Sequence, residues 1–465
     1  VLVIVLDGLR PDYVTADVMP NLHALGERGV IFEKHHAVYP TVTRVNSPSI
    51  ATGSYPGTHG LLGNTMYVPE VNDRPMSMAD ANNLNRIAEA NDGELLTTIS
   101  VGEVLDAAGK ELLAVSSGST GSAMLLNHKG LGKGLIHCDL ILPAEREAEV
   151  RAKLGEVPPE AEPNLGRNQW AVDAYLEYGL GEARPAMTLM WLSDPDHTAH
   201  EYGMGAPETV AALRGVDAEI GRIVATLEER GFADSTTIFV TSDHGFSTHV
   251  GGKDLGGLLR ELGVSDEVVV AGDAIYVKDG NRETITRIVE ALQRAPWAGA
   301  IFTDGESPNA DKGGVPGTLS FQLINFEHPR GPDILFSPNW TDAANEAGFR
   351  GTTTNGGTAG HGSSSPYDIH NTLIVAGAGI KGGVRSSVAS GNVDIVPTAL
   401  HLLNIDAPAS MDGRVLKEVL VDGSSPSDVP TRSESITVSA DGYELTYNGT
   451  TAAGKSYFDG TEVKR

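Results

Sequence analysis

The sequence is poor in cysteine and in positive charge. Its 465 residues include one cysteine, Cys138, so no internal disulfide can form and no cysteine cage can hold a metal ion. Lys and Arg number 34 against 61 Asp and Glu, which leaves a formal net charge of -27. This charge argues against duplex nucleic acid as the main partner, because duplex binding needs a basic face. Any bound metal ion must therefore be held by Asp, His, Glu or hydroxyl groups.

Long hydrophobic runs are also missing. The first apolar run, residues 1–6, stops at Asp7 and is too short to cross a bilayer, so we predict no membrane span in this chain. The sequence opens on Val rather than Met, so we expect that an N-terminal segment is absent from it. We predict a periplasmic or secreted protein, with the cytoplasm as the alternative, and make no prediction of its oligomeric state.

What the sequence does contain is typical of a folded, loop-rich protein. Hydrophobic residues make up 40% and charged residues 20%, with 55 Gly and 25 Pro. These values exclude a coiled coil, a collagen and a largely disordered chain. The length fits one elaborated α/β domain, or a core with an inserted cap.

Short apolar strands alternate with helical patterns along the first 250 residues. Strands are predicted at 1–6, 30–38, 111–116, 186–192 and 236–240, and helices at 19–28, 46–51, 98–108, 169–180 and 209–230. This alternation predicts an α/β fold with a large, mostly parallel sheet and helices on both faces. We expect a long loop at 118–135.

The pattern changes between residues 255 and 338. A strand at 267–270 and a helix at 282–294 are separated by Gly and Pro turns. We therefore predict an inserted α+β cap at 255–338, with residues 1–254 and 339–465 forming the catalytic core. A strand at 373–376 and a helix at 393–403 belong to that core.

Polar residues follow several predicted strands. Asp7, Thr43, Asp196 and Asp243 each come just after a strand, and ligands of parallel sheets bind beyond the carboxyl ends of the strands. Thr43 stands at a strand-to-helix junction, where a helix N-terminus attracts anions. By itself this signal is weak, because most Ser and Thr residues at such junctions are ordinary helix caps.

Histidines accompany these aspartates. His200 is four residues after Asp196, His244 follows Asp243 directly, and His361 lies between two glycines. Asp and neutral His suit Zn²⁺ or a similar divalent ion. Each cluster alone could be turn or capping chemistry. Four such groups at the strand ends of one sheet are harder to explain as turns.

These residues also carry a resemblance. The stretches 3–12, 39–46, 52–60, 195–203, 242–245 and 360–362 resemble, in the same order, the metal motifs of the alkaline phosphatase superfamily. The nucleotide pyrophosphatase/phosphodiesterase branch is the most similar. Residues 393–398 and 411–414 are similar to the closing helix and loop of that superfamily, whereas 70–185 and 255–350 match weakly or not at all.

The resemblance implies a hydrolase of phosphodiester or pyrophosphate bonds with two divalent metal ions, Zn²⁺ being the expected one. It implies that one ion is held by Asp196, His200 and His361, and the other by Asp7, Asp243, His244 and the Thr43 hydroxyl. Thr43 would form a phospho-threonine intermediate. Asn46, one helical turn later, would donate its amide N–H to a phosphate oxygen.

Charge and neighbouring residues bear on the substrate, which we expect to be a small phosphate-containing molecule, with a nucleotide as one candidate. The three aspartates and a Thr43 alkoxide balance two divalent ions, which suits the single negative charge of a diester. The branch usually has an aromatic residue after the nucleophile, where this chain has Arg44. Arg44 could meet a second phosphate charge, stack on a base or lie in solvent. Trp191 could hold an aryl or base leaving group, or pack in the core.

Other functions stay open at this point. A phosphomonoesterase or phosphonate hydrolase of the same superfamily would use Arg44 for the extra charge. A sulfatase is disfavoured because Thr, not a modified Cys or Ser, stands at the nucleophile position, and a cofactor-independent phosphoglycerate mutase would be expected to use Ser. The alternative of another class is a catalytically silent metal-binding module.

Overall fold

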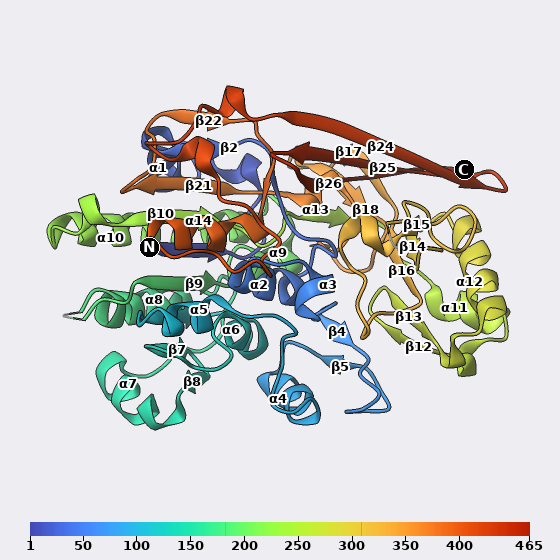
Figure 1. The fold of residues 1–465 in the computed structure, drawn as a ribbon, viewed down its shortest axis with the longest axis horizontal. Helices are drawn as coiled ribbons and strands as arrows, with labels where there is room; N and C mark the ends of the chain where they lie inside the picture. Colours follow the sequence, from blue (N-terminus) through green and yellow to red (C-terminus); the bar gives the residue numbers. More distant parts are fainter. Residues whose placement is uncertain (182, 308) are drawn as a thin grey trace.

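A nine-stranded mixed sheet forms the centre of the molecule. The computed structural model describes residues 1–181, 183–307 and 309–465. In Figure 1 the strands lie stacked one above another, and only β21 and β8 run against their neighbours. The spatial order is β22 (Val384–Ser386), β2 (Val30–Phe32), β21 (Leu373–Gly377), β10 (Thr237–Thr241), β1 (Leu2–Leu6), β9 (Met187–Leu192), β6 (Leu112–Ser116), β7 (Gly134–His137) and β8 (Leu140–Leu142). The predicted mostly parallel sheet is confirmed.

Helices cover both faces because alternate residues of the buried strands point to opposite sides. Leu2, Ile4 and Leu6 of β1 pack in one core with α1 (Pro20–Arg28), α8 (Leu165–Ala174) and α10 (Pro207–Glu229). Val3 and Val5 pack in another with α2 (Thr43–Thr52), α5 (Val101–Ala107), α6 (Thr120–Leu126) and α14 (Ile395–Leu402). This α/β architecture is the predicted one.

Several local expectations need correction. Residues 30–38 are two strands, β2 and the short β3 (His35–His36), which belong to different sheets. The expected loop at 118–135 contains α6, which Ser119 caps by accepting a hydrogen bond from the Ser122 N–H at 3.2 Å. The residues of α6 from Gly121 to Leu126 are buried, so the small residues that read as a loop form a helix packed on α2.

The segment predicted as a cap builds a second sheet. It contains α11 (Leu255–Glu261), β12 (Val268–Ala271), β13 (Ala274–Val277), α12 (Arg282–Arg294), β14 (Ala298–Thr303), β15 (Leu319–Ser320) and β16 (Ile334–Pro338). The five strands pair in the order β12-β13-β16-β14-β15, at the right of Figure 1. The boundaries 255 and 338 as those of a separate unit stay a prediction.

Three long antiparallel strands end the chain: β24 (Thr431–Ala440), β25 (Tyr443–Ala452) and β26 (Lys455–Lys464). We call them the C-terminal meander. Tyr443 donates its hydroxyl to the Gly299 carbonyl at 2.7 Å, so the meander packs on the second sheet. Among the described residues, no helix is long and apolar enough to cross a membrane.

Candidate two-metal active site

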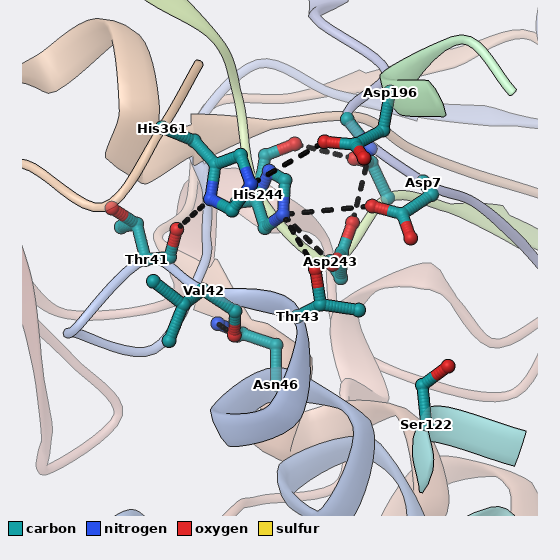
Figure 2. Close-up of polar contacts among 12 residues, drawn as sticks. Asp7, Thr41, Val42, Thr43, Asn46, Ser122, Asp196, Asp243, His244 and His361 are labelled. Atoms are coloured by element: carbon teal, nitrogen blue, oxygen red, sulfur yellow. Dashed lines mark hydrogen bonds and ion pairs between the residues drawn. The ribbon is translucent and has the colours of Figure 1, made fainter. Parts of the chain in front are cut away.

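The candidate residues meet beyond the carboxyl ends of the central strands (Figure 2). Asp7 follows β1, Asp196 begins α9 (Asp196–Tyr202) after β9, and Asp243 and His244 follow β10. His361 follows the short strand β19 (Ala359–Gly360), and Thr43 is the first residue of α2. Adjacent parallel strands end at one edge, so residues far apart in the chain become neighbours there.

Three carboxylates are held close together at this edge. The His244 Nε2 atom lies 3.0 Å from Asp243 Oδ2 and 3.5 Å from Asp7 Oδ1. Asp196 Oδ1 lies 3.2 Å from His200 Nε2 and 3.4 Å from His361 Nε2. The other oxygen of Asp7 accepts a hydrogen bond from Trp191 Nε1 at 3.0 Å, and Asp243 Oδ1 accepts one from the Gly8 N–H at 3.0 Å.

All three imidazole rings are oriented by backbone carbonyls. His200 Nδ1 contacts the Ala359 carbonyl at 3.0 Å, His244 Nδ1 that of Gly245 at 2.9 Å, and His361 Nδ1 that of Thr41 at 2.7 Å. A carbonyl only accepts hydrogen bonds, so each Nδ1 carries the proton, and a neutral ring turns the lone pair of Nε2 towards the carboxylates. This is the arrangement that metal-ligating histidines adopt.

The donor set fits cations. Asp7 Oδ1, Asp196 Oδ1 and Asp243 Oδ2 are buried and accept no hydrogen bond in the described part of the chain. Two groups of ligand atoms lie within 4.8 Å of one another: Asp196 with His200 and His361, and Asp7 with Asp196 and His244. Unpaired carboxylate oxygens facing imidazole lone pairs repel one another unless positive charge lies between them.

The crowding of carboxylates and histidines also shifts their pKa values in the protein without bound ions. Burial, together with the charges of Asp243 and Asp196, raises the pKa of Asp7 well above its usual range. Burial acts to lower the pKa of His200, but the Asp196 carboxylate outweighs it and raises this pKa to about 9. Burial and then the nearby His244 ring lower the pKa of His361 well below its usual value.

Thr43 presents its hydroxyl to this cluster. Thr43 Oγ1 lies 3.3 Å from His244 Nε2, and the residue is 2% exposed. The helix α2 starts at Thr43, and the residue before it, Val42, is the N-cap and makes no side-chain capping bond. Thr43 is therefore the first helical residue rather than a cap, which leaves its hydroxyl free to face the carboxylates.

The side chain of Asn46 is hydrogen-bonded to the backbone in this structure, so its expected contact with a phosphate oxygen stays a prediction. Its side-chain oxygen accepts the Val38 N–H at 2.7 Å, and its amide group donates to the Val38 carbonyl at 2.9 Å. Asn392 donates to the same Asn46 oxygen at 3.0 Å and to the Asp243 carbonyl at 2.8 Å. Figure 2 shows Asn46 beside Val42 on α2. Asn46 thus ties the start of α2 to the loop that carries Asp243.

Asn64 takes a position that the sequence reading missed. Its side-chain oxygen accepts the N–H of Arg44, the residue after Thr43, at 3.0 Å. Its amide NH₂ makes no hydrogen bond within the described residues and is partly exposed. This bond holds the carboxamide to the residue after Thr43 and leaves its two N–H donors available. The signal in the sequence was weak, a single Asn in a loop ahead of β4 (Thr65–Met66).

The two expected substrate contacts differ in their setting. Trp191 is fully buried in β9, with its indole N–H bonded to Asp7, so it orients a carboxylate and cannot stack on a substrate. Arg44 is half-buried on the first turn of α2, and its side chain makes no hydrogen bond or ion pair among the described residues. Burial and the neighbouring carboxylates have the larger effects on the pKa of Asp7, and the charge of Arg44 acts to lower it. Arg44 therefore lies close enough to this centre to affect it.

One buried carboxylate holds two of the ligand-bearing loops. Asp368 accepts hydrogen bonds from the Ser363 N–H at 2.9 Å and the Ser363 hydroxyl at 2.6 Å, and from the Ser247 hydroxyl. Its backbone carbonyl accepts the Gly245 N–H at 2.7 Å. The loops after His244 and after His361 are thereby joined through one side chain.

Comparison with known proteins places the chain in a family. The family model described as type I phosphodiesterase / nucleotide pyrophosphatase matches residues 1–341. Bis(5'-adenosyl)-triphosphatase enpp4 of Mus musculus is 23% identical over 87% of this chain and 77% of its own length. Ectonucleotide pyrophosphatase/phosphodiesterase family member 1 of Homo sapiens is 28% identical over 88% of this chain, which spans only 40% of that relative.

Solved structures show the same fold. Murine ectonucleotide pyrophosphatase/phosphodiesterase 5, an inactive form in complex with AMP, superposes with a TM-score of 0.63 at 18% identity, covering 88% of this chain and 96% of that one. A mutant of alkaline phosphatase PafA superposes with a TM-score of 0.69 at 16% identity, covering 90% and 98%. The fold is therefore alkaline-phosphatase-like, and the chain belongs to the type I phosphodiesterase / nucleotide pyrophosphatase family of enzymes.

Proposed function

We propose that this enzyme hydrolyses phosphodiester or pyrophosphate bonds through a phospho-threonine intermediate at Thr43. The observation that carries the proposal is the buried Thr43 hydroxyl, 3.3 Å from His244 Nε2, at the edge of a cluster of three carboxylates and three histidines. A nucleophile at the first turn of a helix, beside groups that can hold cations, matches the needs of phosphoryl transfer.

Two divalent ions, with Zn²⁺ as the expected metal, belong to this proposal. Asp196, His200 and His361 would hold one, and Asp7, Asp243, His244 and the Thr43 hydroxyl would hold the other. When bound, such ions lower the pKa of a hydroxyl and stabilise the charge that develops on phosphate oxygens. The three unpaired carboxylate oxygens support this assignment.

The protein's own groups then have distinct tasks. Thr43 Oγ1 forms a bond to phosphorus as the bond to the leaving alcohol or phosphate breaks, and the hydroxyl proton passes to solvent. The Asn64 amide donates a hydrogen bond to a nonbridging phosphate oxygen, where negative charge grows in the transition state. Water next breaks the phospho-threonine bond, which releases a phosphomonoester and restores the Thr43 hydroxyl.

The substrate class follows from charge and from the relatives. The three aspartates and the Thr43 alkoxide offset two divalent ions, so the loaded site suits the single negative charge of a diester linkage. The names of relatives include a bis-adenosyl-triphosphatase, and one structural neighbour was solved with AMP. These relationships support a nucleotide as a candidate substrate.

The experiment compares a bis-aryl phosphate with the corresponding mono-aryl phosphate for the zinc-loaded protein. We expect a higher kcat/KM for the diester, no measurable turnover with Thr43→Ala, and partial activity with Thr43→Ser, which keeps a hydroxyl. Full activity of Thr43→Ala would refute the nucleophile. A strong preference for the monoester would refute the diester assignment while leaving the nucleophile intact.

Arg44 favours a second candidate, a phosphomonoesterase or phosphonate hydrolase. Its guanidinium has no partner among the described residues, and a monoester brings a second negative charge that a guanidinium binds well. On this reading Arg44→Gln lowers kcat/KM for the monoester more than for the diester. An equal effect on both substrates counts against the second candidate.

Metal analysis separates both enzymes from a catalytically silent module. A chain that binds no ion after Zn²⁺ supplementation, and turns over neither ester, would be the silent module. Two ions at the reaction centre, each lost when one of its own ligands is substituted, support the enzyme.

A further inference from the structure

A third group of side chains that could hold a metal ion lies outside the residues described above. His36 on β3, His370 on β20 (His370–Asn371) and Asp459 on β26 each offer a ligand atom, and the three atoms lie within 4.8 Å of one another. His36 and His370 face each other across the small sheet β20-β3-β23, with ring centroids 4.6 Å apart. Asp459 comes from the C-terminal meander, so the group joins the meander to the core.

Hydrogen bonding alone does not account for this group. His36 Nδ1 contacts the Ser390 carbonyl at 2.7 Å and so must carry a proton. In a neutral ring Nε2 is then an acceptor, yet it lies 2.8 Å from the acceptor oxygen Asp459 Oδ1. The contact is favourable only if a second proton makes His36 an imidazolium, or if a cation binds both atoms.

The second histidine favours the cation. His370 Nε2 lies 3.8 Å from the same Asp459 oxygen, beyond hydrogen-bond distance, and makes no hydrogen bond in the described part of the chain. An imidazolium at His36 would give His370 nothing to bind, whereas a metal ion takes one nitrogen from each ring. Ligand atoms about 2.0–2.2 Å from a tetrahedral Zn²⁺ lie roughly 3.3–3.5 Å apart. The separations of 2.8 and 3.8 Å bracket this value.

The surroundings resemble those of the reaction centre. There each histidine donates Nδ1–H to a backbone carbonyl and presents Nε2 to a carboxylate, as His36 does here. The other oxygen of Asp459 accepts the Thr450 hydroxyl at 2.6 Å, which fixes the carboxylate. The side chain of His36 is 2% exposed, but those of His370 and Asp459 are 32% and 23% exposed, so an ion can enter from solvent.

We propose that His36, His370 and Asp459 bind a further divalent transition-metal ion, of the Zn²⁺ class, which fastens the C-terminal meander to the core. Two imidazoles and one carboxylate suit Zn²⁺, and a water molecule completes the tetrahedron. The ion is structural, because its ligands belong to none of the groups that surround Thr43.

The test counts Zn²⁺ per chain after loading and removal of loosely bound metal. We expect three ions in the wild-type chain and two in His370→Gln and Asp459→Asn, with hydrolysis of the bis-aryl phosphate retained. His401→Gln removes an exposed histidine outside the three metal groups and is the matched control, expected to keep three. Thr450→Val should weaken binding of the extra ion by about 10- to 100-fold.

Thermal unfolding gives a second readout. Zn²⁺ should raise the midpoint of the wild-type chain more than that of His370→Gln, because only the former gains the meander contact. Equal ion counts in the wild type and His370→Gln would overturn the extra site. That result would leave the proposed function untouched. The proposed function depends on the ions near Thr43, and loss of an ion in His361→Gln tests those.

Discussion

At the scale of single residues, two asparagines near Thr43 differ in whether their amide N–H groups are already hydrogen-bonded. Asn46 is one helical turn after Thr43, yet its amide is consumed by the Val38 backbone. Asn64 is distant in the chain, yet it is hydrogen-bonded to the residue next to Thr43, and its NH₂ makes no hydrogen bond among the residues that the structure describes. Proximity in sequence did not predict which amide keeps its N–H groups available, because side-chain direction depends on what each side chain packs against.

Removing the Asn64 amide should affect catalysis alone. We expect Asn64→Ala to lower kcat about 100- to 1,000-fold, as for other donors to a developing oxyanion, with little change in the thermal midpoint. Steady-state kinetics on the bis-aryl phosphate and thermal unfolding measure the two effects. Unchanged kcat would remove Asn64 from the mechanism.

Removing the Asn46 amide should affect stability first. Asn46→Ala leaves the buried Val38 N–H and carbonyl without their partners, at a cost of about 1–3 kcal/mol for each unsatisfied group. Denaturant unfolding should show this loss, whereas activity per folded molecule falls less than in Asn64→Ala. A fully stable but inactive Asn46→Ala would instead support a hydrogen bond from the Asn46 amide to a phosphate oxygen of the substrate.

At the scale of elements, the site depends on how loops are held between strands and short helices. Asp7, Asp196 and Asp243 come from the ends of neighbouring parallel strands, and this placement was predictable because such strands end at one edge. His361 arrives on a loop between β19 and α13 (Pro366–Ile369), where bonds to Thr41 and Asp368, and those of Ser364 to Ser337 and Thr461, hold it in place.

Asp368 offers a test of this support. Asp368→Asn keeps the shape but replaces one acceptor oxygen with a donor, so the side chain can no longer accept from Ser247 and from both Ser363 donors at once. We expect the affinity for divalent ions to fall about 10- to 100-fold, measured by competition with a chelator. Asp234→Asn, at an exposed aspartate ahead of β10 and thus at the opposite end of that strand from Asp243, should leave the affinity unchanged. Equal affinity in both variants would argue that the loops are held by other contacts.

At the scale of the whole molecule, the central sheet brings several carboxylates together at one edge, and the nearby positive side chains that the structure describes do not balance their negative charge. The chain carries a net charge of -27, and three buried carboxylate oxygens meet at one edge without hydrogen bonds in the described residues. Burying like charges costs free energy unless a counter-charge is present. The folded state should therefore depend on its ions.

Removing the ions should destabilise the whole molecule. Each ion present at about 100 times its dissociation constant contributes about 2.7 kcal/mol to the free energy of unfolding. We expect a chelator to lower the thermal midpoint and abolish hydrolysis, and Zn²⁺ to restore both. His361→Gln should show a smaller response to the chelator, because it has less bound metal to lose. A midpoint that the chelator does not move would contradict this account of the charge cluster.

The sequence by itself determined the family, the alternation of strands and helices, and the polar residues at the strand ends, because these depend on local patterns and on short spacings. The tertiary structure decided the rest. It buried Trp191 against Asp7, directed Asn46 inward and brought Asn64 beside Arg44. It also joined His36, His370 and Asp459 from three separate strands. These contacts join side chains that are far apart in the sequence, and local sequence patterns do not predict which of them will meet.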